Sequence, residues 1–267
     1  MKVAFIGGGK MAEAILHGVL FGKLAGPKDI SVGEPVAERR EYLTSQFGVN
    51  TDADNLKTAQ QADLVVFAVK PQDLGLVMGQ LKGKLGTDQA ALSIVAGAKV
   101  ETLTKGLGHT SVVRVMPNTP AQIGAGMTLW TCSDGVDESR REMTKSVLGS
   151  IGQEIYVDDE KYMDMATALS ASGPAYVFLF IEALIDAGVY VGMPRDMART
   201  LALQTVFGST KLMMDTGMHP AELKDMVVSP GGTTAEALRV LEDQGVPAAI
   251  VSAVDAAYRK SIQLGRG

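Results

Sequence analysis

The chain has 267 residues and a mass of 28.1 kDa, with 46% hydrophobic, 5% aromatic and 21% charged residues and a net charge of −5. These values exclude disordered, collagen-like and coiled-coil proteins, and a compact monomer of this mass would expose about 11,100 Å². No stretch concentrates lysine and arginine, so we expect neither nucleic acid nor an anionic membrane as a partner.

The cysteine and histidine content limits the chemistry further. Cys132 is the single cysteine and the three histidines are scattered, so we expect neither an intramolecular disulfide nor a metal site. The apolar run before the first glycines is too short for a signal peptide, and the apolar segment 175–191 is interrupted by Glu182 and Asp186. The sequence therefore predicts a protein of a reducing, cytoplasmic compartment without a membrane span.

The first part of the chain alternates short β-branched runs with helical patterns, which is typical of a parallel sheet with crossover helices. One run, 64–69, is apolar without alternation and therefore belongs at the sheet centre. A second group of strands, after residue 126, is expected to extend one edge of the sheet. The predicted strands are 3–6, 30–33, 64–69, 92–95, 112–115, 127–132 and 154–157, and the predicted helices are 11–22, 35–47, 100–107 and 138–150.

After the acidic turn at 158–160, no β-rich run follows. At three places a glycine that can end one helix is followed within three residues by a proline that can begin the next. These signals predict helices at 174–191, 194–216, 220–228, 233–244 and 247–264. We therefore predict two domains, 1–158 and 159–267. Apolar residues cover more than half the circumference of helix 174–191, which predicts a homodimer, although one internal helix surrounded by its own chain would give the same pattern.

A glycine-rich segment directly follows the first predicted strand and opens a helix. It fits the pattern G-x-G-x-x-A, in which the glycines allow a tight turn and a close approach of backbone N–H groups to a pyrophosphate. Its residues are Gly7, Gly8, Gly9, Lys10, Met11 and Ala12. Glu34, at the end of the second strand, would accept a hydrogen bond from a ribose 2′-hydroxyl and points to NADH, whereas Arg39 and Arg40 could instead meet a phosphate.

Three further strand ends carry candidate ligand-binding residues, because ligands of open α/β sheets bind at the carboxyl ends of the strands. Lys70 could lie beside a cofactor ribose or phosphate. The small residues of 93–97 would let a nicotinamide ring approach the backbone, and Asn118, between two prolines, would point donors toward the same crevice.

Two segments of the helical part place hydroxyl groups and glycine immediately before a predicted helix. The first, 170–176, contains Ser172, and the second contains Ser229, Gly232, Thr233 and Thr234. Free N–H groups at a helix N-terminus can bind a carboxylate, although helix capping alone would select the same residues.

Together these motifs resemble pyrroline-5-carboxylate reductase over nearly the whole chain. The resemblance is carried by 7–12, Asn55, 68–71, 116–120, 172–176 and 229–234, in that order and spacing. One departure is Ala171, where relatives often carry glycine. The resemblance implies a Rossmann-type parallel sheet domain followed by an all-α helical dimerisation domain, with dimers that assemble into decamers in many members.

The resemblance also implies roles for individual residues. NADPH or NADH would contact the glycine segment and Asn55, Ala68, Val69, Lys70, Pro71, Ile94, Val95 and Ala96. The 229–234 segment would hold the substrate carboxylate, in part from the partner subunit, and Thr167 would assist proton delivery to the ring nitrogen.

The predicted chemistry agrees with a site that lacks a strong general acid. A cyclic imine can enter already protonated, so hydride addition depends mainly on alignment. A 3-hydroxyacid dehydrogenase is the first alternative, but such enzymes need a lysine donor on the second domain and none lies between Ser170 and Val191. A non-catalytic dinucleotide-binding protein is the second.

Overall fold

The computed structural model describes residues 1–265. The chain forms two compact units: unit 1 comprises Met1–Ser172 together with the described residues from Ala257 on, and unit 2 comprises Gly173–Ala256. Unit 1 therefore extends past the boundary predicted at residue 158 and takes in the end of the last helix. The predicted boundary marks the end of the sheet, whereas the packing unit continues through the helix that follows it.

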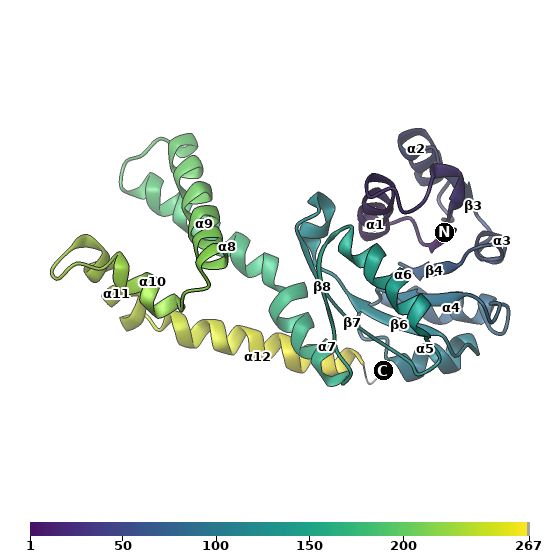
Figure 1. Ribbon diagram of the computed structural model, residues 1–267. Helices are drawn as coiled ribbons and strands as arrows, with labels where there is room; N and C mark the ends of the chain where they lie inside the picture. The colour runs from purple at the N-terminus through teal and green to yellow at the C-terminus, as the bar shows by residue number, and fades with distance from the viewer. Residues whose placement is uncertain (266–267) are drawn as a thin grey trace. The chain divides into compact units, whose positions relative to one another are not determined.

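Unit 1 is built on one eight-stranded sheet with strand order β3-β2-β1-β4-β5-β6-β7-β8 (Figure 1). All neighbouring strands are parallel except β6 and β7, which are antiparallel. The strands are β1 (Val3–Ile6), β2 (Ile30–Gly33), β3 (Asn50–Asp52), β4 (Leu64–Phe67), β5 (Ala90–Ser93), β6 (Val112–Met116), β7 (Gly126–Cys132) and β8 (Gly152–Tyr156).

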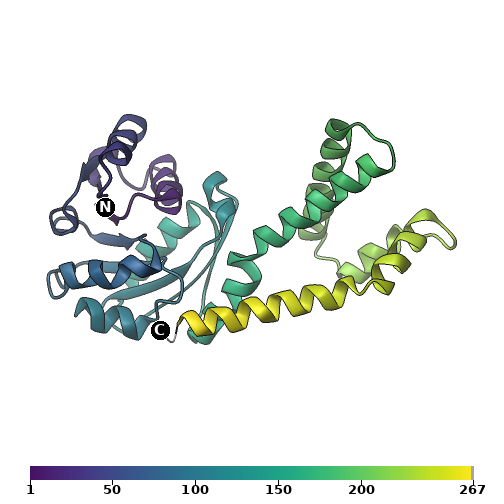
Figure 2. The ribbon, with the colours of Figure 1, turned by 180° about the vertical axis from the view of Figure 1, so that it is seen from behind.

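Alternation along the strands supplies a hydrophobic core on each face of the sheet. Val3 and Phe5 of β1 belong to one core, while Ala4 and Ile6 belong to the other. The first face is covered by α1 (Lys10–Phe21), α2 (Ala37–Phe47) and α6 (Glu138–Gly149), and the second by α3 (Asn55–Ala59), α4 (Pro71–Leu81) and α5 (Val100–Leu107). Figure 2 shows unit 1 from the side of α4 and α5.

The sheet confirms the predicted parallel fold and the central place of β4, with small corrections of bounds. The strand predicted at 64–69 ends at Phe67, and the one predicted at 92–95 runs over Ala90–Ser93. Helix α4 was not among the predicted helices, because Gly75 and Gly79 interrupt its apolar pattern. The short elements α3 and β3 were missed as well. Strands β7 and β8 extend the edge of the sheet as predicted.

The sheet edge also contains the single tryptophan of the chain. Trp130 on β7 is 3% exposed, its indole N–H donates to Glu154 Oε2 at 2.5 Å, and its ring lies 4.8 Å from that of Tyr156. Both partners are on β8, so these contacts tie the last strand to the sheet.

The region after β8 is helical, as predicted. Short helix α7 (Lys161–Ala166) passes through a π-helical turn, η3 (Thr167–Ala171), into α8 (Gly173–Tyr190). The others are α9 (Arg195–Thr216), α10 (Pro220–Met226), α11 (Thr233–Asp243) and α12 (Val246–Leu264). Gly192, Gly217 and Gly245 all have positive φ, which confirms the predicted helix stops.

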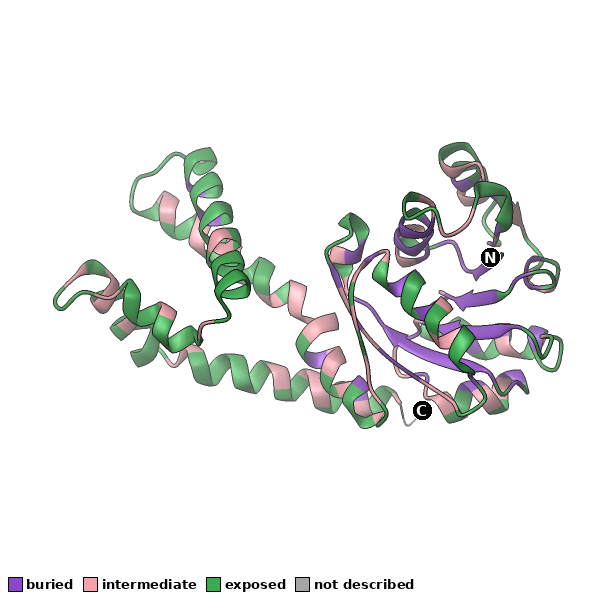
Figure 3. Ribbon diagram, in the orientation of Figure 1, coloured by how far each residue is buried: buried purple, intermediate pink, exposed green. Residues whose placement is uncertain are grey.

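Unit 2 buries little of its apolar surface. Within Gly173–Ala256 only Ala198 and Ala202 are buried, and most of its helical surface is exposed (Figure 3). By length and composition alone one helical run among the described residues, Lys161–Tyr190, is apolar enough to cross a membrane, which is weak evidence because core helices of soluble proteins pass the same test.

Candidate functional site

The glycine segment forms an open backbone turn at the carboxyl end of β1. Gly7 has φ of +96°, and a Cβ there would lie 2.8 Å from the Ala68 carbonyl oxygen, so glycine is required. Gly9 is the N-cap of α1 and has no side-chain cap, and a Cβ at this position would meet no atom within 4 Å. The N-terminus of α1 therefore has no side-chain cap and has open space at Gly9, which suits the binding of a diphosphate.

The rest of the segment packs as its pattern predicts. Gly8 lies so close to α2 that a Cβ would meet Leu43 Cδ1 at 2.8 Å. Ala12 is 2% exposed against the core, whereas Lys10 is exposed. The backbone can therefore reach a ligand while helix and strand stay close.

Glu34, at the end of β2, faces the glycine segment. Its Oε2 accepts the Gly8 N–H at 3.0 Å and its Oε1 accepts the Val36 N–H at 3.0 Å. A carboxylate has further lone pairs, so Glu34 can also accept a hydroxyl hydrogen bond. The structure thus places Glu34 beside the predicted pyrophosphate cradle.

The two arginines of α2 are both engaged by the protein itself. Arg39 donates to the Gly8 carbonyl at 2.6 Å and to Glu13 Oε2 at 2.5 Å. Arg40 donates to the backbone carbonyls of Glu34 and Pro35 at 2.7 and 2.8 Å. From the sequence, both were candidates for surface residues or phosphate ligands, and nothing in it revealed that Arg39 braces the glycine turn.

Asn55 and Lys70 lie where helices begin: Asn55 starts α3, which follows β3, and Lys70 caps α4, which follows β4. Asn55 Nδ2 donates to Gln80 Oε1 at 2.8 Å, and its Oδ1 would lie 2.6 Å from a Cβ at Gly33. Ala68 and Val69 are half-buried after β4, and exposed Lys70 is the N-cap of α4, with Pro71 in its first turn. Lys70 lies at the carboxyl end of β4, as predicted, and Asn55 lies against Gly33 at the carboxyl end of β2.

The loop after β5 contains the small residues predicted to face a nicotinamide. Ile94 and Ala96 are half-buried, and Val95 is 3% exposed with its N–H donating to Ser93 Oγ. The loop turns at Gly97, where φ is +77° and a Cβ would lie 3.1 Å from the Leu264 carbonyl oxygen. The end of α12 therefore packs on this loop.

Asn118 joins the loop after β6 to the π-helical turn. Its Oδ1 accepts the Met127 N–H at 2.9 Å, and its Nδ2 donates to the Ser170 carbonyl at 3.3 Å and lies 3.4 Å from Ser170 Oγ. Thr167 begins that turn, and its hydroxyl donates to the Met163 carbonyl at 2.8 Å. Both polar ends of the Asn118 amide thus have protein partners.

Segment 170–176 is not an open helix N-terminus, and that prediction is wrong. The Ser172 N–H donates to the Thr167 carbonyl at 2.9 Å within a helical run that is continuous from α7 to α8. The Ser172 N–H is therefore engaged by a backbone carbonyl and is not free for a carboxylate.

The second segment is an open N-terminus within unit 2. Gly232 is the N-cap of α11 without a side-chain cap, and Gly231 has φ of +68° with nothing within 4 Å of its Cβ position. Ser229 accepts the Gly232 N–H through its carbonyl at 3.0 Å, which closes the turn. Thr233 and Thr234 then form the first turn of α11, so hydroxyls and free N–H groups share one end of the helix.

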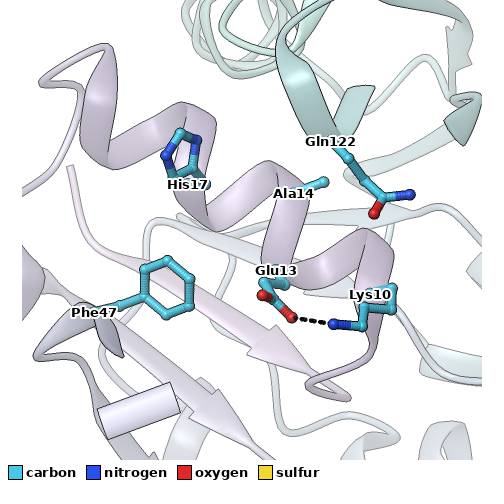
Figure 4. A pocket seen from close by; sticks show the side chains of 6 residues that line it. All are labelled: Lys10, Glu13, Ala14, His17, Phe47 and Gln122. Atoms are coloured by element: carbon cyan, nitrogen blue, oxygen red, sulfur yellow. Dashed lines mark hydrogen bonds and ion pairs between the residues drawn. The ribbon is translucent and has the colours of Figure 1, made fainter. Parts of the chain in front are cut away.

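A separate pocket lies along α1 and is lined by Lys10, Glu13, Ala14, His17, Phe47 and Gln122 (Figure 4). It shares only Lys10 with the predicted cofactor residues, so we do not assign the cofactor to it. Burial raises the pKa of Glu13, but hydrogen bonds from Arg39 and Tyr42 outweigh burial and leave this pKa below its ordinary value. Glu13 is thus a charged partner that holds Arg39.

A buried cluster of charged side chains around β6 was not predicted from the sequence. Arg114 on β6 is 1% exposed and pairs with Glu160 and Asp164. The sequence does contain one hint of this cluster, because Arg114 is the single charged residue within the apolar strand 112–116. Among residues 1–265, no three His, Cys, Asp or Glu side chains gather as metal ligands would.

Comparison with protein families gives two matches. Residues 160–264 match the family described as pyrroline-5-carboxylate reductase dimerisation, and residues 2–97 match the family described as NADP oxidoreductase coenzyme F420-dependent.

Individual relatives match all or nearly all of the chain. The pyrroline-5-carboxylate reductase of Synechocystis is 43% identical over 100% of this chain and 99% of its own length, and that of Escherichia coli is 41% identical over 99% and 98%. Among solved structures, the Plasmodium falciparum pyrroline carboxylate reductase with NADP bound has a TM-score of 0.91 at 34% identity, covering 99% of this chain and 98% of that one. The Coxiella burnetii pyrroline-5-carboxylate reductase has a TM-score of 0.90 at 34% identity, covering 98% of each chain.

Proposed function

This chain belongs to the pyrroline-5-carboxylate reductase family and reduces the C5=N imine of 1-pyrroline-5-carboxylate to L-proline with a hydride from NAD(P)H, and we propose which of its residues do so. The identity of 43% over the full length carries this function. It also sets aside the dehydrogenase and the non-catalytic alternatives. Which residues bind the cofactor and the substrate is the proposal that follows.

We assign cofactor binding to unit 1. The open N-terminus of α1 and the space at Gly9 fit a diphosphate, and the strand-end positions fit the rest of a dinucleotide. When bound, the nicotinamide supplies the hydride. The proposed contacts are Gly7, Gly8, Gly9, Lys10, Met11, Ala12, Glu34, Asn55, Ala68, Val69, Lys70, Pro71, Ile94, Val95 and Ala96.

We assign the substrate carboxylate to the N-terminus of α11. The dipole and free N–H groups of this helix attract an anion without a nearby lysine or arginine, and the Thr234 hydroxyl adds a donor. Ser229, Gly232 and Thr233 complete the proposed cradle, from this chain or from its partner. Asn118 and Ser172 are proposed to shape the substrate site.

Thr167 is the proposed catalytic residue. The imine binds as its conjugate acid, so the chain must hold a proton at the ring nitrogen and exclude water rather than supply a strong acid. A hydroxyl can orient such an N–H through its oxygen while it donates to another acceptor. Thr167 already donates to the Met163 carbonyl, which leaves its oxygen lone pairs available as acceptors.

We propose that NADH is preferred over NADPH. Glu34 offers an acceptor for a ribose hydroxyl and repels a 2′-phosphate, and both nearby arginines are engaged elsewhere. Glu34→Ser should shift the ratio of kcat/KM values toward NADPH by about tenfold or more. A parent enzyme that already prefers NADPH would contradict this assignment.

The chain acts as a homo-oligomer on a small-molecule substrate. The finer assembly, dimers that form a decamer, is a proposal based on the resemblance, as is the division into a dinucleotide-binding domain at 1–158 and a substrate-binding and dimerisation domain at 159–267. We also propose a cytoplasmic enzyme without nucleic-acid or membrane partners, because the charge is dispersed and a single cysteine is present.

The substrate assignment is tested with the imine and both cofactors in an absorbance assay. Thr234→Ala should raise the KM for the imine about tenfold, the value of one lost hydrogen bond to a charged group, and leave the Kd of the cofactor unchanged. Thr200→Ala, on α9 and outside the proposed cradle, is the matched control. Parental kinetics in Thr234→Ala would remove α11 as the carboxylate site.

A further inference from the structure

A buried arginine stands outside the proposed chemistry. Arg114, in the middle of β6, is 1% exposed, and its guanidinium donates to Glu160 Oε1 at 2.8 Å and to Asp164 Oδ1 at 3.5 Å. Both carboxylates belong to the α7 region. A buried cation is tolerated only with such partners, and removal of one partner is strongly destabilising.

Each carboxylate makes a second contact that extends the cluster. Glu160 Oε1 also accepts the Val100 N–H at 2.8 Å, at the start of α5. Asp164 Oδ1 also accepts the hydroxyl of Ser261 at 2.8 Å, and Ser261, on α12, is 5% exposed. One arginine therefore links β6, α5, α7 and α12 within unit 1.

The loop that follows the strand of Arg114 contacts the end of the π-helical turn. Asn118, just after β6, donates to the Ser170 carbonyl. Asp164 lies three residues before Thr167 and Ser170 lies three residues after it. The turn containing Thr167 is thus anchored on both sides by side chains from β6 and the loop that follows it.

These contacts bear directly on the orientation of Thr167. Its hydroxyl donates to the carbonyl of Met163, a residue of α7 whose neighbour Asp164 is held by Arg114. π-Helical turns are rare and are found mostly as single turns at functional sites. A shift of α7 would therefore move the Thr167 hydroxyl together with the backbone that orients it.

We propose that Arg114 is a positioning residue for imine reduction: through Glu160 and Asp164 it holds α7 and η3 so that Thr167 stays in its working orientation. The inference rests on the proposed role of Thr167. Arg114 does not touch the substrate or the cofactor, and it acts on the rate by preorganisation. Loss of the cluster leaves the glycine segment intact.

The test uses Arg114→Lys, which keeps the charge but not the planar fork, and the milder Ser261→Ala. Arg114→Lys should lower kcat about tenfold, keep the Kd of NADH within about twofold, and accelerate amide hydrogen exchange in residues 161–172. Ser261→Ala should change the same quantities in the same direction by a smaller factor. Unchanged exchange in both variants would overturn the proposal.

A double-mutant cycle separates positioning from general stability. If Arg114 acts through Thr167, Arg114→Lys should lower kcat less than about twofold in a Thr167→Ala background. Independent, multiplicative losses would overturn the inference while the proposed function stands. If Thr167→Ala alone has the parental kcat, the proposed role of Thr167 fails and the positioning role fails with it. A parent without imine-dependent oxidation would refute the function itself.

Discussion

The two units of this chain differ in where their apolar side chains are buried. In unit 1, residues from β1, β4 and β5 pack on both faces of the sheet, and most of them are less than 2% exposed. In unit 2, Phe178, Phe180 and Phe207 are each more than half exposed, although the helices that carry them are complete. Local signals suffice to define helices in both units, but only unit 1 has a core of its own.

This difference teaches that helix boundaries and burial have separate causes. In unit 2, glycines with positive φ mark the ends of helices that bury little apolar surface within the unit. The stability of such helices normally comes from a packed apolar face. In unit 2 that face is available to a second copy of the chain, in agreement with the dimerisation family that residues 160–264 match.

The strongest test introduces a charge into the exposed apolar surface of unit 2. Phe178→Glu should convert the oligomer to monomers and lower activity more than about a hundredfold, because unit 2 has too small a core to keep α11 in place alone. Light scattering and circular dichroism measure assembly and helix content. Leu76→Glu, on α4 of unit 1 and 70% exposed, is the control and should leave assembly unchanged. If Phe178→Glu still formed oligomers at micromolar concentration, the apolar face that carries Phe178 would not be part of the subunit interface.

A second test separates packing from ligand binding within unit 1. Gly7→Ala should reduce the free energy of unfolding by about 2 kcal/mol or more, because its φ is +96° and a Cβ would meet the Ala68 carbonyl. Gly9→Ala should change it by less than about 1 kcal/mol, since nothing occupies that space, yet weaken cofactor binding about tenfold. Denaturant unfolding and cofactor titration check both. Equal cofactor affinity of Gly9→Ala and the parent would argue against the diphosphate cradle.

The smallest expected effect concerns ion pairs. The pKa of Glu13 is lowered in the folded protein, so its carboxylate stabilises the fold above the unfolded pKa of about 4.5, and this stabilisation is lost as the pH falls through the folded pKa. Glu13→Gln should therefore cost up to about 1 kcal/mol at neutral pH and nothing in strong acid, as measured by urea unfolding at several pH values.

The matched control for Glu13 lies in unit 2. Glu236 pairs with Arg239 on α11, but both side chains are exposed. Glu236→Gln should leave the stability unchanged at every pH. If Glu236→Gln lowered the free energy of unfolding more than Glu13→Gln does, the expectation that the half-buried ion pair of unit 1 stabilises more than the exposed pair of unit 2 would be wrong.

Much of the fold was predictable because it depends on local pattern. The parallel sheet, the central β4 and the helix stops all follow from apolar runs and glycine placement. Helix α4 was missed because its two glycines mask the pattern. The start of the helix predicted at 174–191 agrees with α8, but the sequence does not reveal the π-helical turn that leads into it and engages the Ser172 N–H.

The site was predictable to the extent that single segments define it. The glycine turn and the open end of α11 have the backbone geometry that their residues predict. The bracing of Gly8 by Arg39 and the cluster around Arg114 join residues 31 and 46 or more positions apart. Periodicity and motifs carry no information on such pairs, so these contacts could not be derived from the sequence.

The contacts of Trp130 have a practical consequence for spectroscopy. Because this indole is the single one in the chain and is enclosed in the sheet, its fluorescence reports on that unit alone. Circular dichroism, in contrast, averages over helices everywhere in the chain. Recording both signals during one denaturant titration would thus show whether the unit without its own core melts first, with no label attached.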